Sequence, residues 1–346
     1  MQMVLKELKK NFLKYAKGFC FSENYSVFCT GQRAFICDRE LNLLYTVEKL
    51  SYVYYASVSP DEKTLLLVSN SNIFYLVDLN VFSVKKYTIR GKFSDNLEGC
   101  GCWSFEGKSL YFNVCNRKTL NSALRRYDLS NDMSYEDMLI EKYWLVSIKP
   151  VKELNKYMLI GLDRKKQELD RIDCWTLVWF DGTIFEEYPM RSVDVCDDGI
   201  KYAEYDVITD TVILYGHSKT FRCDLQGKIL ENLSFFSMEK LTGSFSNVLS
   251  GLEYSNEDLD LLKRLSAFLE MKNVSLDDST EKICLSSDGK KYYVGTHLGL
   301  FIIDAETKAV LKKEEIDYGV QDIAEISKNV IAVSTWNGVK IFEVVD

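Results

Sequence analysis

Short apolar segments alternate with polar turns along the whole chain, and the pattern repeats. In one copy, two apolar strands within Ser57–Val68 flank the polar turn at residues 60–63, and a third strand ends at Asp78. A second copy begins at Cys284, turns at residues 288–290 and ends its third strand at Asp304. Polar turns of the Asp-Gly kind between apolar runs indicate β-hairpins, so each copy predicts a small antiparallel sheet.

The acidic residue that ends the third strand gives the register of the repeat. It occurs as Asp38, Asp78, Asp128, Asp181, Asp224, Asp304 and, in substituted form, Glu343. The spacings are 40, 50, 53, 43, 80 and 39 residues, so one step is doubled and the pattern predicts seven units. Aspartate suits this position because its side chain can accept a hydrogen bond from the backbone two residues on, which favours a structural role over a catalytic one.

Each unit also contains a fourth strand, for example at residues 43–47, 83–89 and 310–313. Units of about 40–50 residues with four antiparallel strands are typical of propeller blades. The last unit ends after its third strand, and residues 3–9 alternate like a strand. We therefore expect an all-β, seven-bladed β-propeller of four-stranded antiparallel blades, a single domain over residues 1–346 whose ring the N-terminal strand closes.

The doubled step predicts a helical insertion at residues 236–277, between blades five and six. Within it, Leu259, Leu262, Leu265 and Leu269 recur at helical spacing after the capping sequence at residues 255–258. Charged residues occupy the opposite face, so the segment reads as an amphipathic helix over residues 255–271. Such a helix either packs its apolar stripe on the propeller or serves as a lid or docking helix.

The layout resembles seven-bladed propellers of the WD-repeat and YVTN type. The turns at residues 59–63 and 286–290 and the aspartates at the strand ends carry the resemblance, which covers almost the whole chain. It implies a rigid platform for partners, without identifying one.

Composition and charge narrow the classes of function. The net charge of −8 argues against a nucleic-acid or anionic-membrane binder. Ten cysteines without a CxxC pair and only two histidines give little material for metal sites, so we expect buried core thiols and no cofactor. The N-terminus lacks a signal-like apolar region and no run of about 18 apolar residues occurs, which predicts a cytoplasmic protein.

Loops between blades, and loops between the second and third strands of a blade, emerge on one face of a propeller, which we call the upper face. Arginine and aromatic residues are frequent in interface hot spots, and several fall in these loops. We therefore expect a non-catalytic scaffold, monomeric on its own, that binds a partner protein or peptide there, with most of the acidic residues elsewhere. The candidate residues are Arg33, Tyr52, Arg117, Tyr143, Trp144, Arg164, Arg191, His217, His297, Tyr318 and Trp336.

Two other functions stay open. An inhibitor or immunity-type protein would use its acidic surface to mask a basic partner. A metal-dependent hydrolase or lyase of the lactonase-like type would need ligands at the centre of the ring. There the innermost strands are expected to place Asp194 and Asp322, two carboxylates that could bind a cation.

Overall fold

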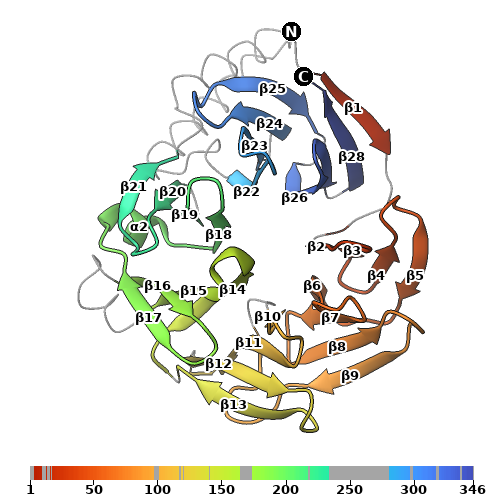
Figure 1. The fold of residues 1–346 in the computed structure, drawn as a ribbon, viewed down its shortest axis with the longest axis vertical. Helices are drawn as coiled ribbons and strands as arrows, with labels where there is room; N and C mark the ends of the chain where they lie inside the picture. The colour runs from red at the N-terminus through yellow and green to blue at the C-terminus, as the bar shows by residue number, and fades with distance from the viewer. Residues whose placement is uncertain are drawn as a thin grey trace, which may run out of the picture.

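Seven four-stranded antiparallel sheets stand around a common centre in the computed structural model, as Figure 1 shows. This arrangement is a seven-bladed β-propeller, which confirms the predicted fold. The structure describes residues 4–9, 13, 16, 18–96, 101–116, 118–119, 121–139, 141–163, 174–216, 219–233, 280–296, 299–316, 319–335 and 337–345. The predicted insertion at residues 236–277 lies outside the described residues.

Within each of blades one to six, the four strands follow one another in chain order from the centre of the ring to the rim. Blade one contains β2 (Gly18–Phe21), β3 (Ser26–Cys29), β4 (Ala34–Cys37) and β5 (Leu43–Val47). Blade two contains β6 (Val53–Val58), β7 (Thr64–Ser69), β8 (Ile73–Asp78) and β9 (Val84–Thr88). Blade three contains β10 (Gly101–Trp103), β11 (Ser109–Asn116), β12 (Asn121–Asp128) and β13 (Ser134–Met138). Blade four contains β14 (Trp144–Val151), β15 (Lys156–Leu162), β16 (Trp175–Phe180) and β17 (Phe185–Pro189). Blade five contains β18 (Tyr202–Asp206), β19 (Thr211–Tyr215), β20 (Thr220–Cys223) and β21 (Ile229–Asn232). Blade six contains β22 (Thr280–Leu285), β23 (Lys291–Thr296), β24 (Gly299–Asp304) and β25 (Val310–Glu315). Blade seven contains β26 (Val320–Ser327), β27 (Val330–Thr335), β28 (Gly338–Val345) and β1 (Val4–Lys9). A short 3-10 helix, η1 (Lys152–Leu154), joins β14 to β15.

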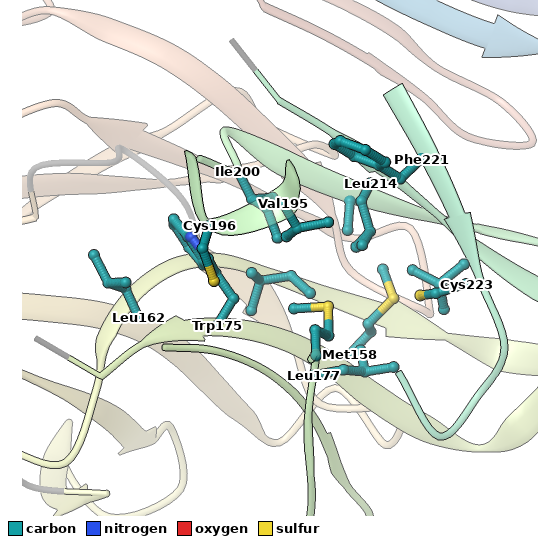
Figure 2. Close-up of a cluster of buried hydrophobic side chains, with 14 of the residues drawn as sticks. Met158, Leu162, Trp175, Leu177, Val195, Cys196, Ile200, Leu214, Phe221 and Cys223 are labelled. Atoms are coloured by element: carbon teal, nitrogen blue, oxygen red, sulfur yellow. The ribbon is translucent and has the colours of Figure 1, made fainter. Parts of the chain in front are cut away.

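The core consists of side chains packed between neighbouring blades. Middle strands are covered on both faces, and all six residues of β23 are buried, whereas the rim strand β25 is mostly exposed or half-buried. Figure 2 shows one such contact, where Met158 and Trp175 of blade four meet Leu214 and Phe221 of blade five. Burial on both faces explains why the middle strands read as continuous apolar runs.

The fourth strand of blade seven comes from the N-terminal part of the chain. β1 pairs antiparallel with β28, with Val4 opposite Val345 and Leu5 opposite Val344. Leu5 also packs against the apolar cluster between blades six and seven. This pairing gives blade seven the same four strands as the other blades and covers the edge of β28.

The aspartates at the strand ends hold the turns that follow them. Asp78 Oδ1 accepts a hydrogen bond from the Asn80 backbone N–H at 2.8 Å. Asp181 Oδ1 accepts in the same way from Thr183 at 2.8 Å, and Asp304 Oδ1 accepts from Thr307 at 2.7 Å. The backbone hydrogen bonds lower the pKa of the Asp181 and Asp304 carboxyls, because they favour the charged form. The repeated aspartate is therefore a turn-forming residue, as its spacing predicts.

One predicted strand is wrong. Asp194, expected on an innermost strand, lies instead in the short helix α2 (Val193–Asp198), and β18 takes the central position in blade five. Ser192 caps the helix by accepting a hydrogen bond from the Val195 N–H, and Asp194 adds an acidic residue in the first turn. Both features favour the start of a helix.

Candidate functional site at the upper face and the ring centre

The loops of the upper face are joined to one another by backbone hydrogen bonds. Gly31 and Val53 exchange two such bonds, each of 2.9 Å, between the β3–β4 loop and the segment that enters blade two. Asn70 donates its N–H to the Tyr52 carbonyl at 3.0 Å. The backbone of Tyr52 is thus fixed on both sides, in a left-handed conformation with φ of 52°.

Two of the predicted partner-binding residues lie on these joined loops with exposed side chains. Tyr52 is 67% exposed, one of the highest values for a large apolar side chain among the described residues. Arg33 is also exposed, and its Nε lies 3.5 Å from the Glu48 carboxylate. An ion pair this exposed contributes little to stability, so the guanidinium can exchange partners at small cost.

Of the other predicted residues, one is buried, one is half-buried, one is exposed, and six lie outside the described residues. Tyr143 is only 7% exposed, and its hydroxyl donates a hydrogen bond of 2.8 Å to Glu187 Oε2. Burial is the main cause that raises the pKa of Tyr143, and the Glu187 carboxylate raises it further. Tyr143 therefore does not project from the upper face as expected, whereas Trp144 is half-buried and Arg191 is exposed. Arg117, Arg164, His217, His297, Tyr318 and Trp336 lie outside the described residues.

Three basic residues of the upper face have acidic partners beside them. The Lys142 ammonium lies 2.6 Å from Glu187, and Lys219 lies 3.0 Å from Asp194. Lys92 pairs with Glu141 in the same way. Acidic residues therefore also lie on this face, beside three of its basic residues, and that most of the acidic residues lie elsewhere stays a prediction.

A line of alternating charges crosses the innermost strands of blades four to seven. Lys149 on β14, Glu204 on β18, Lys282 on β22 and Asp322 on β26 form it, and we call them the central charge chain. The Lys149 ammonium lies 2.9 Å from Glu204. Lys282 lies 3.9 Å from Glu204 and 3.7 Å from Asp322. Opposite charges therefore link four consecutive blades, through innermost strands that Figure 1 shows around the ring centre.

Two tyrosines of blade five support this chain. The Lys282 ammonium lies 4.3 Å from the centre of the Tyr202 ring, a cation–π geometry. Tyr202 stacks on Tyr215 with ring centres 4.2 Å apart. The Tyr215 hydroxyl donates to Glu204 Oε2 at 3.3 Å. The aromatic pair thus helps to position both Lys282 and Glu204.

The two carboxylates of the chain have opposite pKa shifts. Burial acts to raise the pKa of Glu204, but the Lys149 and Lys282 ammonium groups hold it below its usual value. Burial prevails for Asp322, whose pKa is raised although Lys282 lies beside it. Burial acts to lower the pKa of Lys282, yet neighbours that include Asp322 and Glu204 raise it. Glu204 is thus stabilised as a carboxylate, and Asp322 is the weaker acid.

The expected pairing of Asp194 and Asp322 at the ring centre is wrong. Asp322 belongs to the central charge chain, but Asp194 lies on α2, which Figure 1 shows away from the centre. The Asp194 side chain is 68% exposed and pairs with Lys219. Within the described part of the chain, no group of three or more His, Cys, Asp or Glu side chains is placed to hold a metal ion.

The sequence does carry a signal for the central charge chain. Each of the four strands places one of the charged residues next to a buried apolar residue, as in Lys149 after Ile148 and Asp322 before Ile323. Sequence reasoning misses Glu204 because it places Asp194 on the innermost strand of blade five, and it misses Lys149 and Lys282 because their partners lie on other blades. With β18 in that position, a charge at the centre of each of the four blades becomes visible.

The described residues include no helix of the length and apolarity that crossing a membrane requires. The sequence matches no protein-family model and no curated protein.

Proposed function

We propose that this protein is a non-catalytic scaffold that binds a partner protein or peptide on its upper face. The observation that carries the proposal is Tyr52, which has an exposed ring on a backbone fixed by its neighbours. Aromatic residues that supply contact area from a rigid position are frequent among binding hot spots. Little ordering of Tyr52 would be needed on binding, because its backbone is already held.

The exposed ring of Tyr52 supports a role beyond packing. A tyrosine with a φ of 52° adopts a backbone region that side chains disfavour, and its ring makes little use of the protein interior. Arg33, on the adjoining loop, would add a guanidinium to the same contact.

The test places a photo-reactive phenylalanine analogue at position 52 and, as a control, at Val81. Val81 is 70% exposed, which matches Tyr52, but it follows β8 in a turn on the opposite face. Cross-linking in the native host cells identifies the partner, whose affinity is then measured for Tyr52→Ala and Val81→Ala. We expect Tyr52→Ala to weaken binding at least about tenfold and Val81→Ala to leave it unchanged. Equal affinity of both variants, or cross-links only from position 81, would contradict the proposal.

Salt dependence separates this function from an inhibitor that masks a basic partner. Three basic side chains of the upper face already have acidic partners, so contact there should respond weakly to ionic strength. An acidic surface that neutralises a basic partner would instead lose affinity steeply as salt rises. Affinity of the purified partner at low and high salt therefore distinguishes the two modes of binding.

A further inference from the structure

Two cysteine sulfur atoms meet between blade four and α2. Cys174 directly precedes β16, and Cys196 lies on α2, which leads from blade four to blade five. Their Sγ atoms are 3.1 Å apart. This separation is shorter than the contact distance of about 3.5–4.0 Å between carbon atoms, although sulfur is the larger atom.

The surroundings hold the two thiols in this position. The Cys174 carbonyl accepts a hydrogen bond from the Asp163 N–H at 2.7 Å, and the Cys196 N–H donates to the Ser192 carbonyl at 3.1 Å. Both cysteines belong to the apolar cluster of Figure 2, where Cys196 lies beside Trp175. A close-packed interior resists separation of the two sulfur atoms, because any gap would lose contacts.

We propose that Cys174 and Cys196 are a site of reversible disulfide formation when the protein meets a peroxide. Cys196 is 9% exposed and Cys174 is 0% exposed, so Cys196 reacts first. Hydrogen peroxide oxidises the Cys196 thiol to a sulfenic acid and releases water. The Cys174 thiol then attacks that sulfur, the S–S bond forms, and a second water leaves. The two thiols lose two electrons and two hydrogens in total, and the peroxide is reduced to two waters.

The disulfide would join α2 covalently to blade four. α2 also carries Asp194, which pairs with Lys219 in the β19–β20 loop of blade five. Oxidation would therefore fix one segment of the upper face between two blades. This site does not depend on the proposed partner, and it can be tested on the isolated protein.

The experiment uses the full chain treated with hydrogen peroxide. The protein is then denatured, alkylated with N-ethylmaleimide and digested without reductant. We expect a cross-linked peptide that joins Cys174 to Cys196 and disappears with dithiothreitol. A rise in melting temperature on oxidation should accompany it, because a cross-link restricts the unfolded chain.

Variants separate this pair from general thiol oxidation. Cys196→Ser should abolish both the cross-linked peptide and the rise in melting temperature. Cys223→Ser removes another buried thiol of the same cluster and should keep both. Full alkylation of Cys174 and Cys196 in the peroxide-treated wild-type protein would overturn the proposal, as would a cross-link from Cys196 to another cysteine. The peptide map of the oxidised wild-type protein tests the proposal even if a variant fails to fold.

Discussion

Arg125 donates two parallel hydrogen bonds to Asp137, from Nε to Oδ1 at 2.6 Å and from Nη2 to Oδ2 at 2.8 Å. The arginine side chain is 0% exposed. Its guanidinium carbon lies 3.9 Å from the centre of the Tyr135 ring, and Nη1 donates to the Arg90 carbonyl at 2.6 Å. The pair therefore joins two strands of blade three to the segment that enters this blade.

Removal of Asp137 should destabilise the protein strongly. Asp137→Ala leaves a buried guanidinium without its carboxylate, and loss of one partner of a buried ion pair costs about 3–5 kcal/mol. The double variant Arg125→Met/Asp137→Ala should lose less, because no buried charge remains. Urea unfolding of the single and double variants measures the difference. As a control, Glu343→Ala breaks the exposed pair with Lys6 and should cost less than about 1 kcal/mol. Equal free energies of unfolding for Asp137→Ala and the double variant would argue against this account.

Glu204 should stabilise the protein at neutral pH and not in acid. Its pKa is lower in the folded chain, so its stabilising effect is present above the unfolded pKa of about 4.3 and is lost as pH falls through the folded value. Glu204→Gln should therefore lower the free energy of unfolding at pH 7 by roughly 1–3 kcal/mol. The difference from wild type should shrink in acid. Urea unfolding of both proteins from pH 7 into acid measures this difference in the free energy of unfolding. A difference that does not change with pH would contradict the prediction.

Asp322 should behave in the opposite way. Its pKa is raised on folding, so it favours the folded state below the unfolded pKa, and this effect is lost as pH rises through the folded value. Asp322→Asn removes a carboxylate that burial disfavours. At pH 7 we expect unchanged stability or a gain of up to about 1 kcal/mol. The same urea titrations compare it with Glu204→Gln, and a clear loss of stability at pH 7 would show that Lys282 outweighs burial.

Loss of β1 should weaken the ring. Deletion of residues 1–9 uncovers the edge of β28 and removes Leu5 from the cluster between blades six and seven. We expect the melting temperature to fall by about 5 °C or more, with self-association through the open edge. Calorimetry and size-exclusion chromatography measure these effects. Deletion of residues 1–3 leaves β1 in place and serves as the control. Equal melting temperatures for the two deletions would mean that the β1–β28 pairing contributes little.

The fold could be predicted from the sequence because its signals are local. Asp78 and Asp304 each contact backbone atoms within three residues, so the turn chemistry is visible in a short window of sequence. The central charge chain depends on contacts between distant residues, such as Lys149 and Glu204, 55 residues apart. The expectation that Tyr143 projects from the upper face fails for the same reason, because its partner Glu187 is 44 residues away. Position in a loop does not show which way a side chain points.

The pairing of β1 with β28 also determines how the ring responds to mechanical force. Val4 lies opposite Val345, so tension between these residues acts on one end of an antiparallel pair. The hydrogen bonds of such a pair carry the load one after another and not together. A pull between the two ends of the chain should therefore peel β1 from blade seven at low force, while the strands of the other six blades stay paired.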